Sequence, residues 1–185
     1  MIDFAPSKDQ EEIRKLAKKF AKEVIRPAEM EIDKIADPDE AYGSVAFKDA
    51  IRQAYEIGFH KMGIREEFGG MGLDPTTTAL VWEELAVGGI GITATLLAAP
   101  VATLFISILA GNRQDMVDRF VIPFCEDTKG EHITAWGSSE GNIGSDGSNY
   151  YDPGVRHETK AKNKDGKWII EGAKSSLVRN SGIAD

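Results

Sequence analysis

The stretch Trp136-Gly137-Ser138-Ser139-Glu140-Gly141-Asn142-Ile143-Gly144-Ser145-Asp146 decides how this sequence is interpreted. It follows a short apolar strand pattern at Ile133 and Ala135. Glycine lets a backbone approach a flat ligand or an anion closely, and serine hydroxyls supply adaptable hydrogen-bond donors. Composition alone favours an ordinary loop of turn-forming residues. The position directly after a strand instead suggests a loop that binds a ligand.

The order of residues in this loop resembles a known motif. Acyl-CoA dehydrogenases contact flavin and acyl-CoA with an aromatic, two residues, Thr or Ser, Glu, a glycine-rich turn and then Gly-Ser-Asp. The matching places here are Trp136, Ser139, Glu140 and Gly144-Ser145-Asp146. Two further stretches carry the same resemblance: Gly63 to Asp74, and Asp165 to Lys174 followed by Asn180 to Asp185. The resemblance therefore runs along the whole chain in the family's order.

The resemblance implies roles for residues of this loop. Trp136 and Ser138 are expected to contact the edge of the flavin ring, and the Ser139 hydroxyl is expected to donate to a ring atom. Ser145 is expected to contact the pantetheine or phosphate region of coenzyme A. Glu140 matches the motif's acid but not the catalytic base.

The segment Lys174 to Ser181 departs from the family pattern, because it is one residue longer. Aligned backwards from Gly182, it puts Leu177 at the place of an aromatic that shields the flavin and Arg179 at the place of a hydroxyl. Aligned from Lys174, it puts Ser176 and Val178 there instead. Leu177 and Arg179 are taken as candidate cofactor-binding residues. Arg179 beside a flavin would favour the anionic reduced ring; without flavin, it is expected across the ring site, paired with Glu140.

Composition narrows the classes of protein. The 185 residues carry a formal net charge of −8, which disfavours binding to nucleic acid or to an anionic membrane. The single cysteine, Cys125, cannot form an internal disulfide, and the first residues show no secretory signal. We therefore expect a cytoplasmic protein.

The stretch Ile90 to Ala110 contains no charged residue and is about as long as a membrane span. Several threonines and a serine dilute it, Pro100 interrupts it, and no basic cluster flanks it. The sequence favours a buried central helix of a bundle over a membrane span.

Helical periodicity dominates the first two thirds of the chain. Ser7 and Gln10 form a capping-box signature, and the apolar pattern that follows predicts a long amphipathic helix ending near Pro27. Asp74-Pro75 marks another helix start. Further apolar helical faces are predicted around Phe47 to Ile57, Leu80 to Leu85 and Met116 to Val121.

The pattern becomes strand-like at Lys129-Gly130, where we place a domain boundary. His132 to Trp136 is predicted to be a strand. Val155 to Lys162 and Lys167 to Glu171 are predicted to pair as a hairpin, because Asp165-Gly166 suits a tight turn. The predicted fold class is α+β: an all-helical N-terminal bundle, residues 1–129, followed by the first strands of a β-barrel-like domain, residues 130–185. The tyrosine-containing stretch Gly147 to Gly154 is interpreted as an inserted surface loop.

Other kinds of site are disfavoured. The three histidines are scattered and no cysteine pair exists, so no metal site is predicted. Gly69-Gly70-Met71-Gly72 follows no strand and is interpreted as a tight loop rather than a dinucleotide site. The family's acyl pocket is lined by the central helix, which makes Thr95, Ala98 and Ala99 candidate substrate-binding residues. A plain helix contact through small residues explains them equally well.

The function implied by the resemblance is part of an FAD-dependent acyl-CoA dehydrogenase of fatty-acid metabolism, which converts an acyl-CoA to an enoyl-CoA. The family's C-terminal helical domain, which carries the base, is missing, so the chain alone is expected to be inactive. The implied partners are acyl-CoA, another subunit in a homo- or hetero-oligomer, and an electron-transfer flavoprotein. A flavin-less, non-catalytic subunit of a heteromeric enzyme is the alternative, and an oxidase or flavin monooxygenase on the same scaffold is a third option.

Overall fold

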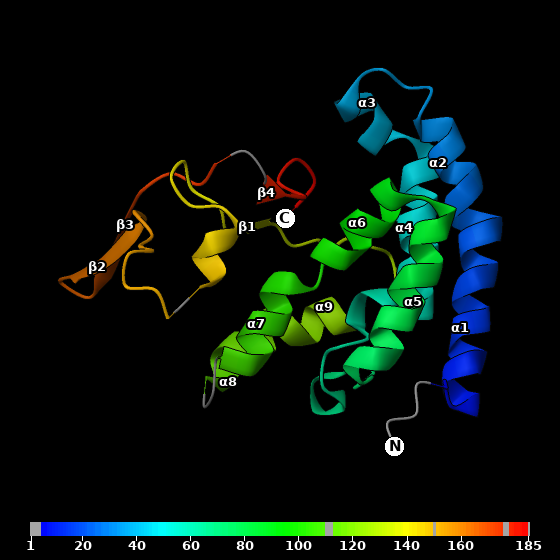
Figure 1. Ribbon diagram of the computed structural model, residues 1–185, viewed down its shortest axis with the longest axis horizontal. Helices are drawn as coiled ribbons and strands as arrows, with labels where there is room; N and C mark the ends of the chain where they lie inside the picture. Colours follow the sequence, from blue (N-terminus) through cyan, green and yellow to red (C-terminus); the bar gives the residue numbers. More distant parts are fainter. Residues whose placement is uncertain (1–4, 110–112, 150, 176–177, 185) are drawn as a thin grey trace.

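The computed structural model describes residues 5–109, 113–149, 151–175 and 178–184. Helices gather on one side and the strands lie on the other (Figure 1). In chain order the elements are α1 (Lys8–Phe20), η1 (Ala21–Ile25), α2 (Arg26–Ile32), α3 (Pro38–Gly43), α4 (Val45–Ile57), η2 (Phe59–Lys61), η3 (Glu66–Phe68), α5 (Pro75–Gly88), α6 (Ile90–Ala98), α7 (Val101–Leu109), α8 (Gln114–Met116), η4 (Val117–Val121), α9 (Ile122–Glu126), β1 (Trp136–Gly137), η5 (Ser145–Ser148), β2 (Lys160–Lys164), β3 (Lys167–Glu171) and β4 (Val178–Arg179). The predicted α+β class, with a helical N-terminal region before the start of a sheet, is confirmed.

The first helix begins as predicted and ends later than predicted. Ser7 and Gln10 form the capping box at the start of α1. The predicted end near Pro27 is wrong, because the chain continues through the π-helical turn η1 into α2. The Arg26 N–H donates to the carbonyl of Ala21, five residues back. Pro27 then stands in the first turn of a new α-helical segment, where a missing N–H and a fixed φ are tolerated.

The first helix packs along α5, which is capped by Asp74 as predicted. Arg14 donates to Glu84 at 2.7 Å, and a Cβ on Gly88 would lie only 2.6 Å from the Ala21 carbonyl oxygen. The close approach of these two backbones therefore requires glycine at position 88.

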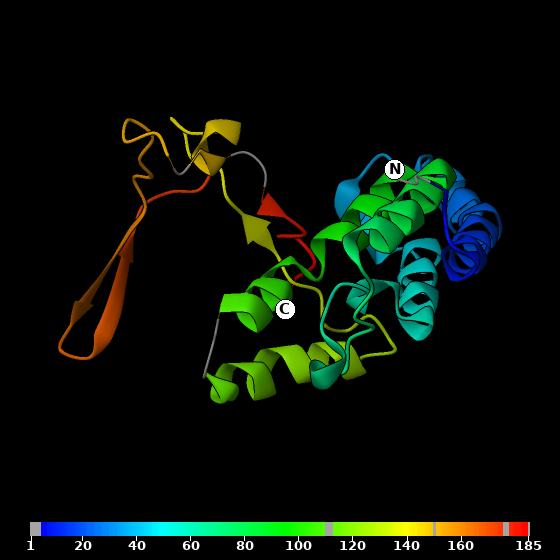
Figure 2. The ribbon, with the colours of Figure 1, turned by 60° about the horizontal axis from the view of Figure 1, so that its bottom comes forward.

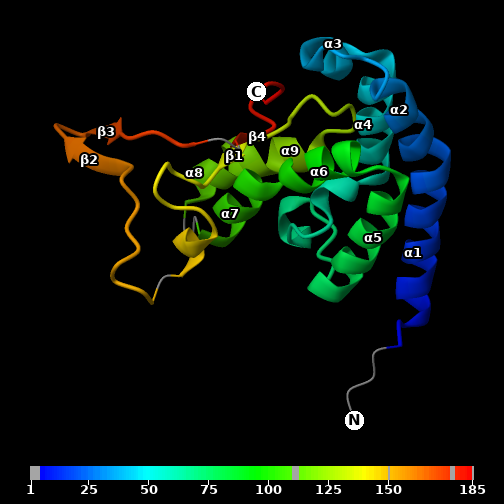
Figure 3. The ribbon, with the colours of Figure 1, turned by 45° about the horizontal axis from the view of Figure 1, so that its top comes forward.

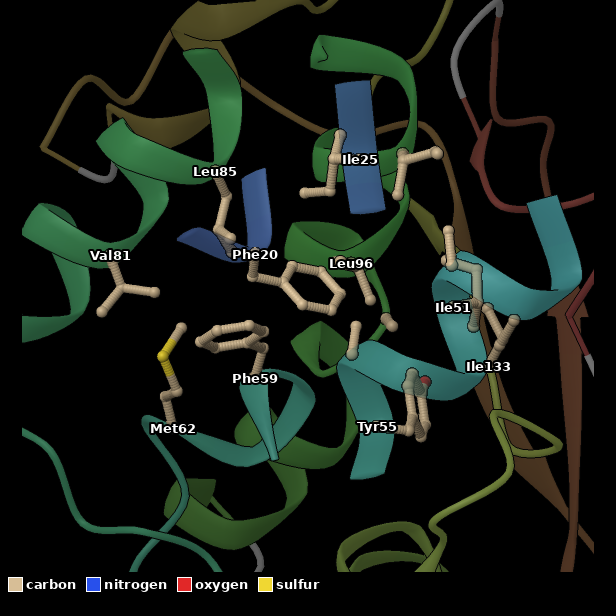
Figure 4. Packing of buried hydrophobic residues seen from close by; sticks show 14 of the residues in the cluster. Phe20, Ile25, Ile51, Tyr55, Phe59, Met62, Val81, Leu85, Leu96 and Ile133 are labelled. Atoms are coloured by element: carbon tan, nitrogen blue, oxygen red, sulfur yellow. The ribbon is translucent and has the colours of Figure 1, made fainter. Parts of the chain in front are cut away.

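The hydrophobic core lies among these helices (Figure 4). Phe20 of α1 and Phe59 of η2 meet edge to face, with ring centroids 5.2 Å apart. Buried side chains of α4, α5 and α6 belong to the same cluster: Ile51, Tyr55, Val81, Leu85 and Leu96. Since all five helical segments contribute, the helical region folds around one shared core.

The apolar stretch Ile90 to Ala110 is not one buried helix. Of its described residues, Ile90–Leu109 is long and apolar enough to cross a membrane, but 44% of the most apolar window is buried inside the protein and core helices pass the same test. Pro100 separates α6 from α7, because proline supplies no N–H to continue the ladder. The prediction of burial holds for most of α6 and is wrong for one face of α7, where Phe105, Ile108 and Leu109 are exposed.

The turn after α9 leads out of the helical region. The buried carboxylate of Asp127 accepts backbone N–H groups from Lys129, Gly130 and His132. Beyond it, the Tyr55 hydroxyl donates to the His132 carbonyl, and the Thr134 hydroxyl donates to the carbonyl of Ala99. The predicted strand His132 to Trp136 is therefore mostly an extended segment held by helices, and regular pairing begins only at Trp136.

Two separate antiparallel pairs make up the described strands. Trp136 of β1 lies opposite Arg179 of β4. The predicted hairpin is confirmed as β2 and β3, joined by Asp165 and Gly166, whose φ angles are 53° and 80°. The first strand begins at Lys160 rather than at Val155. This hairpin projects away from the helices (Figure 3), and all of its strand residues are exposed.

Candidate functional site

Residues from two distant parts of the sequence meet where β1 pairs with β4. Trp136 and Arg179, 43 positions apart, occupy opposite places in the register. The two strands lie side by side in Figure 2. The Ser175 N–H donates to the Ser139 carbonyl at 2.9 Å, which ties the next part of the loop to the same segment. The Arg179 side chain is exposed, and none of the described acids forms an ion pair with it. Two predicted cofactor-binding residues are thus brought together, whereas Leu177 lies outside the described residues.

The indole of Trp136 is stacked on a helix. Its ring lies parallel to that of Phe105 of α7, with centroids 4.7 Å apart and planes 8° from parallel. Phe105 keeps 42% of its surface exposed, and Trp136 is half-buried. Stacked aromatic rings attract one another, so this contact docks β1 on the face of α7 that the sequence did not predict to be exposed.

A hollow of 390 Å³ opens beside this stack. Its lining comes from α7, the glycine and serine loop and two later residues: Phe105, Trp136, Gly137, Ser138, Gly144, Gly147, His157 and Lys174. An aromatic wall, glycine backbone and polar side chains are the ingredients of a small-molecule site.

The Ser138 and Ser139 hydroxyls remain available to a ligand. Ser138 is exposed and Ser139 is half-buried, and neither hydroxyl bonds to any residue that the structure describes. Their carbonyls are engaged instead, by Lys174 and by the Ser175 N–H. Free donors beside a partly exposed aromatic ring fit the polar edge of a flavin, so the residues present are compatible with FAD.

Glu140 follows these serines and is buried. Its carboxylate accepts N–H groups from Glu158 and Thr159 and the Lys174 amine at 2.8 Å, and His157 Nδ1 lies 3.5 Å away. Hydrogen bonds, that from Lys174 foremost, lower the pKa of Glu140 to about 2. The pairing of Arg179 with Glu140, expected for a protein without flavin, is not found among the described residues, where Lys174 is the partner of Glu140.

Ser145, the candidate for contacting coenzyme A, begins the short helix η5 and is exposed. Asp146 accepts the Gly144 N–H at 2.7 Å and fixes this turn. Gly144 itself lines the 390 Å³ hollow, so Ser145 stands next to its rim.

The three candidate substrate residues, on α6 and at its C-terminal cap, differ in whether they line a hollow. Thr95 lines a second hollow, of 470 Å³, together with Arg179 and Tyr42. Ala98 and Ala99 are each only 1% exposed, and Ala99 belongs to the hydrophobic core. Thr95 and Arg179 therefore line the same hollow, whereas both alanines are packed among other side chains.

Sequence reasoning did not assign several residues that build these hollows. The Asn180 amide donates to the carbonyls of Thr95 and Thr134, which fastens the end of β4 to α6. Phe105 and His157 line the first hollow. Asn180 lies in a stretch that carries the family resemblance, so sequence reasoning could have identified it. Phe105 looked like one more core residue, and His157 only reaches the site because the loop before it folds back.

That loop contains the predicted insertion, Gly147 to Gly154. Tyr151 is 98% exposed, as expected of a surface excursion. A Cβ on Gly147 would lie 2.8 Å from Ile143 and 3.1 Å from the His157 ring. Glycine at the start of the loop therefore allows His157 to pack beside the hollow.

Residues 7–127 match the family described as acyl-CoA dehydrogenase, N-terminal domain. The chain therefore belongs to the acyl-CoA dehydrogenase family, as the loop motif predicted. The short-chain specific acyl-CoA dehydrogenase of Clostridium acetobutylicum is 25% identical over 184 residues, which cover 100% of this chain and 43% of the relative.

Solved structures support the fold. A nitroalkane oxidase variant crystallised with 1-nitrooctane has a TM-score of 0.80 at 24% identity, covering 98% of this chain and 40% of that one. PigA with FAD and proline has a TM-score of 0.74 at 26% identity, covering 100% and 43%. The chain spans less than half the length of these relatives.

Proposed function

We propose that this chain is the N-terminal part of an FAD-dependent acyl-CoA dehydrogenase. The observation that carries the proposal is the pairing of β1 with β4. In a chain of this family, the pairing brings Trp136 and Arg179 together beside the free serine hydroxyls. Relatives described as acyl-CoA dehydrogenases and a relative holding FAD support the class of chemistry.

The proposed reaction removes the α proton of an acyl thioester and a hydride from its β carbon, leaving an enoyl-CoA. FAD, when bound, supplies the hydride acceptor. Trp136 and Ser138 form the wall against the ring, and the Ser139 hydroxyl donates a hydrogen bond to it. The positive charge of Arg179 would favour the anionic reduced form of the flavin ring.

The acyl-CoA is proposed to lie on the same side. Ser145 at the rim of the first hollow contacts the coenzyme A portion, and Thr95 in the second hollow contacts the acyl chain. Glu140 is not assigned as the base, because its buried carboxylate is held by several hydrogen bonds that lower its pKa and make it a weak proton acceptor. No described residue is assigned that role.

The test uses the full-length protein. We expect a yellow protein with bound FAD, bleached anaerobically by an acyl-CoA, with an enoyl-CoA detected by mass spectrometry. A panel of acyl chain lengths, with a nitroalkane and free proline for comparison, identifies the substrate class. Reduction of an electron-transfer flavoprotein in place of a dye tests the proposed acceptor.

Other outcomes have defined meanings. A colourless protein that takes up no FAD would contradict the proposal and favour the non-catalytic subunit. Bleaching by a nitroalkane but by no acyl-CoA would retain the flavin and reject the thioester chemistry. Residues 1–185 alone are expected to give no turnover.

A further inference from the structure

Glu140 is the buried acid of the serine loop, Trp136 to Asp146. It lies at the centre of a small polar cluster that joins three segments. The side chain of Glu140 is 1% exposed. It accepts the backbone N–H groups of Glu158 and Thr159, which come from the segment before β2. Lys174, which follows β3, supplies the third donor. A buried carboxylate is tolerated only where such donors satisfy it, and here each segment supplies one or more.

Lys174 holds two consecutive parts of the loop at once. Its amine lies 2.8 Å from Glu140 Oε1 and 3.2 Å from the Ser138 carbonyl oxygen. The next residue, Ser175, donates its backbone N–H to the Ser139 carbonyl. Three successive residues of the loop are therefore fixed by two successive residues that lie 34 to 36 positions further along the chain.

The other side of Glu140 is also closed. Its backbone exchanges hydrogen bonds with Ile143, of 2.9 and 3.2 Å, and Ile143 is 4% exposed. A shift of the loop would therefore break hydrogen bonds either at the Ser138 and Ser139 carbonyls or at the turn between Glu140 and Ile143. The hydroxyls of Ser138 and Ser139 form no hydrogen bond to any residue that the structure describes, so they remain able to donate to a ligand.

We propose that Glu140 and Lys174 are positioning residues that hold the serine loop in the geometry needed for flavin contact. The inference rests on the proposed function for the identity of the ligand. Neither residue is proposed to contact a reacting atom. Glu140 acts through the backbone of the loop. Lys174 donates both to the Glu140 carboxylate and to the Ser138 carbonyl. Regular strand pairing ends at Gly137, and beyond that residue Glu140 and Lys174 hold the loop in its place.

The experiment measures FAD affinity in the full-length protein by flavin fluorescence and records the visible flavin spectrum. The variants are E140Q, which keeps the shape and removes the charge, K174M, which removes both contacts, and K174R, which keeps the charge and its donors. K162M is the matched control, because Lys162 is exposed on β2. The double variant E140Q/K174M leaves no unpaired buried ion, so it tests the loop even if a single variant does not fold.

The expected result is a loss of FAD affinity of about tenfold or more in E140Q, K174M and the double variant, since charged hydrogen bonds are lost. Their flavin spectra should also change. K174R should recover most of the affinity, and K162M should match the parent. The proposal is overturned if the double variant binds FAD within about threefold of the parent, or if K174R is as weak as K174M.

A second measurement separates this inference from the proposed function. Hydrogen exchange of the backbone around Ser139 is recorded in the protein without FAD. Faster exchange in the double variant than in the parent is expected whether or not the parent binds FAD. A parent that binds no FAD contradicts the proposed function alone, whereas unchanged exchange in the double variant contradicts the positioning role.

Discussion

The helical region and the strand region of this chain are stabilised in different ways. Nearly all of the buried hydrophobic side chains come from residues 17–125, where helices share one core. Among the described residues after Gly130, only Ile133 and Ile143 are buried hydrophobics, and the hairpin exposes Trp168, Ile169 and Ile170. The strand region is instead held by the stacking of Trp136 on Phe105 and by polar contacts, around Glu140 and between Asn180 and α6. Stability is therefore concentrated in the helices, and ligand-binding groups are concentrated in the strands.

The largest expected effect tests this contrast directly. Leu85 is fully buried, so Leu85→Ala should lower the free energy of unfolding by about 3 kcal/mol through lost burial and a cavity. Ile170→Ala, at a side chain that is 72% exposed, should change it by less than about 0.5 kcal/mol. Urea denaturation measures both. Equal losses would show that the hairpin is packed as tightly as the helices.

His60 gives the helical core a dependence on pH. Burial lowers the pKa of this ring, stacked on Tyr55, to about 4 from an ordinary 6.5. Between these values the unfolded chain binds a proton that the folded chain does not, so stability should fall as pH falls from 6.5 to 4. The loss should approach about 3 kcal/mol.

Urea titrations at a series of pH values measure this slope. His60→Phe should flatten it, because an aromatic ring remains and the titrating group is gone. An identical slope in the parent and in His60→Phe would assign the acid sensitivity to other groups.

The strand region should respond through the cofactor rather than through stability. Arg179→Thr removes a positive charge opposite Trp136, so the flavin potential should fall by about 30 mV for each tenfold loss in preference for the anionic reduced ring. Spectroelectrochemical titration of the full-length protein measures it. Arg156→Thr, at another exposed arginine, should leave the potential unchanged. A potential equal to the parent's would show that the charge of Arg179 does not act on the flavin.

The smallest effect concerns one hydroxyl. Ser139→Ala should weaken FAD binding by about 1 kcal/mol, the typical value of one hydrogen bond, with no change in unfolding. Ser145→Ala should instead raise the KM for acyl-CoA. Flavin fluorescence and steady-state kinetics distinguish the two. An Ser139→Ala protein with the parent's FAD affinity and reduction rate would remove Ser139 from the site.

The local features of this protein were determined by its sequence. The capping box of α1, the start of α5 at Asp74 and the turn at Asp165-Gly166 depend on neighbours a few residues away, and the structure has all three. The loop motif also identified the family. Helix continuation past Pro27 was missed, because a π-helical turn leaves no signal in apolar periodicity.

The contacts that make the site were decided only by the tertiary structure. The register of Trp136 against Arg179, the stacking on Phe105 and the choice of Lys174 as the partner of Glu140 join residues more than thirty positions apart. The pattern along a chain states which residues are apolar or charged, but not which distant ones meet. That choice depends on packing and on satisfying every buried polar group at once, which is a property of the folded whole.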